Sequence, residues 1–208
     1  RLIPQFYQKH HFAYDRVKKG FILVLWGFFQ KIAIADRIAL VVDPVFATPE
    51  KFGGMQLIVT AVLFTFQLYC DFAGYTNIAL GTARMLGFDL MDNFNKPFRA
   101  KNVSEFWRRW HISLSSWARD YLYLPITFGR RGWGRWATVY AVFITFVFIG
   151  IWHGAKWSYL FFGLSMGVAF YVELQTTDFR LRLAARLPMW FCNGGSVLLT
   201  FSYICILF

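Results

Sequence analysis

Residues 106–125 read FWRRWHISLSSWARDYLYLP and combine a dense group of charges with aromatic side chains in the middle of the chain. At about 100° per residue, a helix over this stretch separates its apolar and polar side chains onto opposite faces. The apolar face holds Phe106, Trp107, Trp110, Leu114, Trp117, Ala118 and Tyr121, and the polar face holds Ser104, Arg108, His111, Ser115, Arg119 and Asp120. Because a lone span would hold these arginines in hydrocarbon, we expect an amphipathic interfacial or re-entrant helix, which ends before Pro125.

The composition is that of a membrane protein. Of 208 residues, 57% are hydrophobic and 16% are charged, which is more apolar and less charged than an average soluble domain. The formal net charge of +11 would suggest a nucleic-acid partner in a soluble protein. Here the positive charge falls in short loops between apolar runs, which is the usual distribution in membrane proteins. We therefore expect the chain to lie in a lipid bilayer and to bind no nucleic acid.

Five apolar runs predict an all-α, polytopic transmembrane helical bundle. They cover residues 21–42, 55–80, 136–152, 157–174 and 189–208. We expect a single membrane-embedded domain over residues 1–208. The chain starts with Arg1 and stops inside an apolar run, so we expect a fragment, truncated at both ends and inactive by itself.

The loop charges predict which side of the membrane each loop faces. Basic loops at 1–20, 84–109, 129–135 and 178–187 are expected in the cytoplasm, and the loops at 43–54 and 153–156 outside. This count requires residues 84–128 to return to the side they left. It predicts that His111 starts from the cytoplasmic side and His153 from the outer side; if the two meet, we expect them to do so across a narrow passage through the membrane.

The second span carries polar side chains at depth. Gln67, Asp71 and Tyr75 are spaced four apart and share a helix face, with Asn77 nearby. An intramembrane aspartate is a functional candidate, and the alternative is a hydrogen-bonded network that holds helices together.

Three cysteines, all within apolar runs and without paired spacing, predict neither a disulfide framework nor a metal site.

Two histidines are candidates for proton transfer. His153 follows an apolar span and precedes Gly154; an imidazole can take a proton from a hydroxyl near neutral pH, and a glycine permits close approach. A histidine satisfied by hydrogen bonds at a helix end is the alternative. His111 lies one turn from Ser115, a spacing that favours orientation or binding over a nucleophile and its base.

The arginines beside His111 fit an anionic ligand. Arg108 and Arg119 could hold the phosphates of a cytosolic donor by charge-assisted hydrogen bonds. Anchoring to lipid headgroups is an equally open reading.

Four ordered blocks resemble the membrane-bound O-acyltransferase (MBOAT) family. They read QLYCDFAGYTNIALG at 67–81, DNFNKPF at 92–98, EFWRRWHISLS at 105–115 with RDYLY at 119–123, and GIWHGA at 150–155, followed by Trp157. The similarity is greatest to the bacterial alginate O-acetyltransferase branch, related to the membrane protein of teichoic acid D-alanylation.

The resemblance implies a multi-pass enzyme of the inner membrane that takes part in polysaccharide O-acetylation, as in alginate biosynthesis. It implies acetyl-CoA or a similar acyl thioester as donor substrate, no bound cofactor, a separate acyl carrier or donor protein as one possibility, and a periplasmic or extracellular transferase partner. His153 matches the catalytic histidine of the family, with Trp152 beside it, and His111 matches the second motif histidine. Family members commonly carry a further His-Gly where this chain has Met166-Gly167. A transporter or channel, and a non-catalytic scaffold of an acetylation complex, remain the alternatives.

Overall fold

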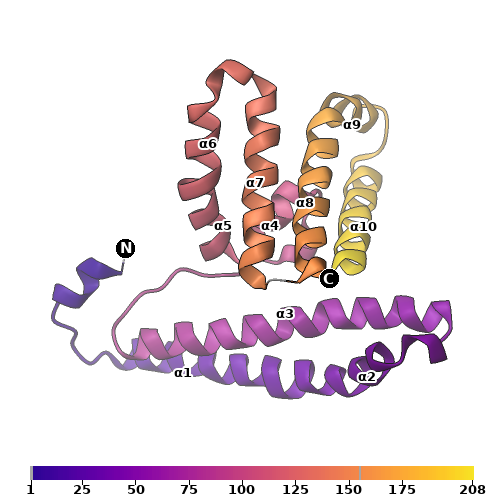
Figure 1. Ribbon diagram of the computed structural model, residues 1–208. Helices are drawn as coiled ribbons and strands as arrows, with labels where there is room; N and C mark the ends of the chain where they lie inside the picture. Colours follow the sequence, from indigo (N-terminus) through magenta and orange to yellow (C-terminus); the bar gives the residue numbers. More distant parts are fainter. Residues whose placement is uncertain (1, 155) are drawn as a thin grey trace. The chain divides into compact units, whose positions relative to one another are not determined.

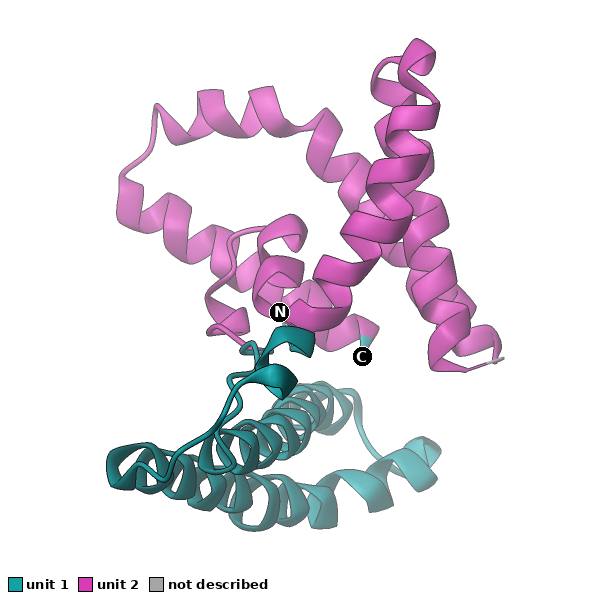
Figure 2. Cartoon of the chain, turned by 90° about the vertical axis from the view of Figure 1, so that its left-hand side faces the viewer, with its two compact units in different colours: residues 1–93, 208 teal, residues 94–207 magenta. Residues whose placement is uncertain are grey.

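The computed structural model describes residues 2–154 and 156–208, and this part of the chain contains helices and no β-strand. It divides into two compact units, residues 1–93 with Phe208, and residues 94–207 (Figure 2). Four of the described helices are long and apolar enough to cross a membrane: α3 (Gly54–Met85), α7 (Arg135–His153), α8 (Trp157–Gln175) and α10 (Met189–Leu207). They confirm the all-α membrane fold and four of the five predicted spans.

The first unit is a pair of long helical rods. One rod joins α1 (Tyr14–Phe28), the π-helix η2 (Phe29–Ala35) and α2 (Asp36–Ala47) without a break, and it lies along α3 (Figure 1). The predicted loop at 43–54 is therefore too long, because α2 continues through Pro44 and only the short η3 (Pro49–Lys51) follows before α3. Burial of Val42 and Val45 offsets the cost of a proline inside a helix.

Glycines bring the two rods of the first unit into backbone contact. A Cβ added to Gly27 would lie 2.6 Å from the carbonyl oxygen of Gly74, and one added to Gly81 would lie 2.5 Å from the carbonyl oxygen of Gly20. Close approach of this kind is how membrane helices gain packing energy where lipid and side chain are equally apolar.

The second unit begins with a short wedge and continues as a row of helices. The wedge consists of η4 (Pro97–Arg99) and α4 (Val103–Arg109), which packs against α8. Then α5 (Ile112–Ala118), the π-helix η5 (Arg119–Tyr123) and α6 (Leu124–Gly129) form a continuous rod that lies antiparallel to α7 (Figure 1). The turn η6 (Arg131–Trp133) connects them, and α9 (Thr177–Ala184) forms within the stretch predicted as a basic loop at 178–187.

The single amphipathic helix predicted for residues 106–125 is wrong in two respects. The helix breaks at Trp110 and His111, where His111 adopts the left-handed conformation at φ 43° and ψ 55°. It also continues past Pro125, the second residue of α6. The π-helix directly before α6 has a wider hydrogen-bond spacing, which eases the clash of the proline ring with the preceding turn.

The break divides the predicted apolar face. Phe106, Trp107 and Trp110 are buried, whereas Trp117 and Tyr121 are 44% and 68% exposed. At the break, the backbone amide of Asn95 donates to the Arg109 carbonyl at 2.9 Å, which takes the place of the next helical hydrogen bond.

Candidate functional site

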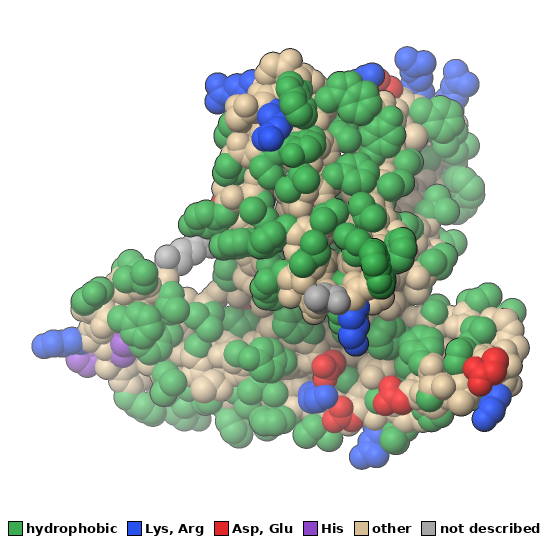
Figure 3. All heavy atoms as spheres, viewed as in Figure 1, with side chains coloured by type: hydrophobic (Ala, Val, Ile, Leu, Met, Phe, Trp, Pro, Cys, Tyr) green, Lys and Arg blue, Asp and Glu red, His purple; other side chains and the backbone are tan. Residues whose placement is uncertain are grey.

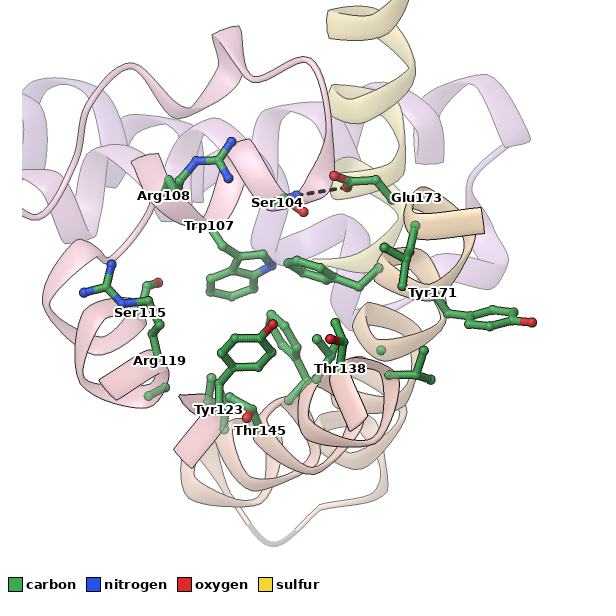
Figure 4. Close-up of a pocket in the computed structure, with 18 of the residues that line it drawn as sticks. Ser104, Trp107, Arg108, Ser115, Arg119, Tyr123, Thr138, Thr145, Tyr171 and Glu173 are labelled. Carbon is green, nitrogen blue, oxygen red and sulfur yellow. Dashed lines mark hydrogen bonds between the residues drawn. The ribbon is translucent and has the colours of Figure 1, made fainter. Parts of the chain in front are cut away.

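A cavity of about 620 Å³ lies inside the second unit, between α4, α5, η5, α7 and α8 (Figure 4). Its apolar wall is built by Ile112, Val139, Val142, Phe146, Ile149, Phe170 and Leu174. Its polar lining includes Ser104, Arg108, Ser115, Arg119, Tyr123, Thr138, Thr145 and Glu173. A largely apolar pocket with a few convergent polar groups is the usual form of a small-molecule site.

Three residues that the sequence predicts as ligand-binding come together at this cavity. Arg108 lies in the last turn of α4, Ser115 in α5 and Arg119 at the start of η5, and all three line one side of the cavity (Figure 4). Arg119 pairs with Asp120 at 2.9 Å, whereas Arg108 makes no ion pair within residues 2–154 and 156–208. Arg108 is exposed, so its guanidinium can bind an anion at the mouth of the cavity.

Ser115 has a structural hydrogen bond of its own. Its hydroxyl donates to the Trp110 carbonyl at 3.1 Å, across the break between α4 and α5. The hydroxyl therefore stabilises the break that orients His111, which agrees with an orienting role and not with a nucleophile.

His111 is the residue at the break itself. It caps the start of α5, and its carbonyl accepts the Ser115 amide at 2.9 Å. Burial, and to a smaller extent the positive charge of nearby His153, lower the pKa of the His111 imidazole to about 4. The ring is therefore neutral at pH 7 and can both donate and accept a hydrogen bond.

His153 is the last residue of α7 and is exposed. Its ring contacts Trp152 edge-on, with centroids 5.0 Å apart, and lies nearly parallel to the ring of Tyr159 at 6.1 Å. Trp152 is 59% exposed beside it. Ala155, the last residue of the GIWHGA block, lies outside the described residues.

His111 and His153 lie at the same end of the antiparallel pair that α5–α6 forms with α7, since one helix begins there and the other ends there (Figure 1). They are close enough for the charge of one to act on the other. The predicted arrangement, with the two on opposite sides of a passage, is therefore wrong. The charge count failed because residues 112–129 run along α7 instead of turning back, and because basic residues such as Arg109 are paired within their own segment, here with Glu105 at 2.7 Å.

Asp71 and Asn77 lie on α3 in the first unit and do not line this cavity. Asn77 donates its side-chain amide to Gln30 at 2.6 Å, and Asp71 forms an ion pair with Lys31. Lys31 also pairs with Asp36 at 2.9 Å. These contacts tie the π-helix η2 to α3, which favours the reading of a structural network over a role at the reacting groups.

Two residues of the site region, Glu173 and Tyr159, were not singled out by the sequence, whereas Met166 was noted there as a departure from the family pattern. Glu173 lines the cavity and accepts the Ser104 amide at 3.1 Å. Met166 is fully buried and accepts a hydrogen bond from the Trp107 indole at 3.4 Å, so it is part of the core of the second unit. Tyr159 packs on His153. The sequence could have pointed to Glu173, because it is the first acidic residue after a stretch, 121–172, that contains none. No feature of the sequence distinguishes Tyr159 from the other aromatic residues.

Comparison with known proteins gives consistent results. The model of the MBOAT, membrane-bound O-acyltransferase family matches residues 7–208. The probable alginate O-acetylase of Pseudomonas putida is 40% identical over 172 residues, which cover 83% of this chain and 35% of that protein. The peptidoglycan O-acetyltransferase of Helicobacter pylori is 36% identical over 83% of this chain and 33% of its own length.

A third relative broadens the group. The teichoic acid D-alanyltransferase of Bacillus subtilis is 35% identical over 156 residues, 73% of this chain and 38% of that protein. The chain thus spans about a third of the length of the curated relatives it matches. Since the family model covers nearly the whole sequence, the chain belongs to the membrane-bound O-acyltransferase family.

Proposed function

We propose that the protein is part of a membrane O-acyltransferase that moves an acyl group, most simply acetyl, from a cytosolic thioester such as acetyl-CoA to a hydroxyl of an exported or cell-surface polysaccharide. The proposal is carried by the placement of His111 and His153 at the same end of the α5–α7 pair, in the unit whose cavity has Arg108 and Arg119 on one side. The relatives support the reaction class, because they include two kinds of O-acetylating protein, an alginate O-acetylase and a peptidoglycan O-acetyltransferase.

In the proposed reaction, His153 takes the proton of the acceptor hydroxyl as its oxygen attacks the thioester carbonyl. The carbon–sulfur bond then breaks, and the thiolate leaves and receives a proton. His111 is neutral at pH 7 and offers a hydrogen bond to the reacting groups without adding charge. Trp152 and Tyr159 flank the His153 ring and limit its rotation.

The donor side of the proposal rests on the cavity. Arg108 and Arg119 would hold the phosphates of a coenzyme-A-type donor, and the apolar wall would receive its uncharged arm. Location in the inner membrane, and a transferase partner outside the membrane, complete the proposal.

The test uses the full-length protein in its native membrane. His153→Ala is expected to abolish acetyl esters on the surface polymer, measured by base-released acetate, while the protein level in the membrane stays unchanged. His10→Ala is the matched control, because His10 lies in the exposed segment before α1 and contacts Gln5. Retained acetylation in His153→Ala would remove His153 from the mechanism.

A further inference from the structure

The turn between α6 and α7 combines arginines with exposed rings. Arg130 lies over the Tyr140 ring at 4.5 Å and over the Trp133 ring at 5.4 Å from the centroid. Arg131 lies over the Phe128 ring at 5.0 Å. Trp133 is 54% exposed, so the ring that carries an arginine on its face is itself open to the surroundings.

The same pattern continues into α7, where Arg135 lies over the Trp136 ring at 5.7 Å. Trp136 is 52% exposed. Each arginine of this turn is thus held in place by a ring and not by a carboxylate.

These charges are not neutralised by the protein around them. The sequence contains no Asp or Glu from residue 121 to residue 172. Within the described chain, none of Arg130, Arg131 and Arg135 forms an ion pair. Three guanidinium groups therefore keep their donors available for an external anion.

The helix α9 adds further charge at the same end of the second unit (Figure 1). It contributes Arg180 and Arg182, followed by Arg186, against the single acid Asp178, and Arg180 donates to the Glu173 carbonyl at 3.0 Å. Figure 3 shows Lys and Arg side chains gathered at this end, above a surface made mainly of hydrophobic side chains. We call residues 128–136 together with α9 and Arg186 the basic–aromatic end.

We propose that the basic–aromatic end docks on the phosphate headgroups of anionic lipids in the cytoplasmic leaflet. Tryptophan prefers the headgroup level, positive loops prefer the cytoplasmic side, and a guanidinium binds phosphate with two parallel hydrogen bonds. This inference concerns orientation and lipid choice and goes beyond the proposed reaction.

The length of α7 determines where its C-terminal end lies in the membrane. Its 19 residues rise about 28 Å, close to the roughly 30 Å of a hydrocarbon core. With one end held at the cytoplasmic headgroups, the other end, which carries His153, lies near the outer face.

A lipid fits this surface better than a soluble anion. The arginines lie on an open turn and not in an enclosed cavity, and their rings are exposed where acyl chains begin. The arginines of the cavity, Arg108 and Arg119, are a different pair.

The first test measures lipid choice with the purified full-length protein. Phosphatidylglycerol added to the detergent-solubilised protein is expected to raise its thermal midpoint more than phosphatidylcholine does. The triple variant Arg130→Gln, Arg131→Gln, Arg135→Gln should lose most of this difference, and the corresponding triple Lys variant should keep part of it. The control triple variant Lys9→Gln, Lys18→Gln, Lys19→Gln removes the same charge from exposed positions of the first unit and should keep the difference.

Two results would overturn the lipid assignment. One is a full phosphatidylglycerol effect in the Gln triple variant. The other is loss of the effect in wild type on addition of inorganic pyrophosphate at equal ionic strength, which would point to a soluble anion.

The second test measures orientation. Gly132→Cys and Lys156→Cys are introduced separately after Cys70, Cys192 and Cys205 are replaced by Ala; a Cβ at Gly132 meets no atom within 4 Å, and Lys156 is exposed. An impermeant maleimide should label Cys at 132 only in inverted vesicles and Cys at 156 only in right-side-out vesicles. The reverse pattern would overturn the proposal whatever the lipid result.

Discussion

The ring of Tyr159 lies over the imidazole of His153, with centroids 6.1 Å apart and planes inclined by 26°. The same ring fills the space beside Gly154, where an added Cβ would stand 2.7 Å from its Cε2 atom. The Tyr159 backbone carbonyl in turn lies against Gly150, one turn before His153. A residue of α8 thereby fixes the end of α7 from which His153 projects.

Replacement of Tyr159 tests this positioning. Tyr159→Leu removes the flat ring, and since a misplacement of about 1 Å can cost on the order of 100-fold in rate, we expect kcat to fall by about 10- to 100-fold with little change in KM. Tyr159→Phe keeps the ring and should restore the rate. The measurement is acyl transfer by the full-length protein; a Phe variant as poor as the Leu variant would show that the hydroxyl, and not the ring, matters.

Gly154 can be tested with a matched glycine. Gly154→Ala forces its new methyl group against the Tyr159 ring, which must shift and take its contact with His153 along. Gly132→Ala meets no atom within 4 Å and serves as the control. We expect a clear loss of transferase activity in the first variant and none in the second, at equal protein levels; equal activities would contradict the packing argument.

The lowered pKa of His111 should make the stability of the protein depend on pH. Its pKa of about 4 in the folded protein lies below the usual value near 6.5, so the unfolded chain binds the proton more readily between these pH values. Stability is therefore expected to fall as the pH is lowered from 6.5 toward 4, by on the order of 1 to 3 kcal/mol for a half-buried ring.

The measurement is the thermal midpoint of the full-length protein at pH 7.5 and at pH 5. His111→Gln should lose less stability on acidification than wild type, whereas His10→Gln, which changes an exposed ring in the first unit, should behave as wild type. If the wild type and His111→Gln respond equally to acid, the burial of a neutral His111 is refuted.

Asp71 and Lys31 test whether the first unit carries a structural network. Asp71→Asn leaves Lys31 with Asp36 alone, and we expect a lower thermal midpoint with little change in activity per folded molecule. The double variant Asp71→Asn, Lys31→Met should be less destabilised than the sum of the two single variants. A loss of activity without a loss of stability would instead return Asp71 to the functional candidates.

The hydrophobic runs predicted most of this fold, because a span needs only length and apolar composition. The runs at 136–152 and 157–174 differ from α7 and α8 by a single residue at each differing end. The break at His111 carried no such signal, since neither Gly nor Pro stands there. At the break, the Asn95 amide occupies the Arg109 carbonyl from 14 residues away.

The sequence predicted individual residues of the site but not which helices bring them together. The composition of the stretch around Arg108, Ser115 and Arg119 indicated one polar surface, and the three do line one cavity. The opposite wall comes from α7 and α8, and no periodicity within one segment reveals which residues another helix brings to it. The same limitation hid Tyr159 and misplaced His153 relative to His111.

The two π-turns, η2 and η5, have a consequence for how such a chain can change over time. A π-turn holds about one more residue than an α-turn, so the deletion of one residue from 119–123 would return the rod to regular α-helix while the residues after it keep their faces toward α7. In a regular α-helix the same deletion would rotate everything after it by about 100°. The two π-turns are therefore places where a single codon can be lost without changing the face that the following helix presents.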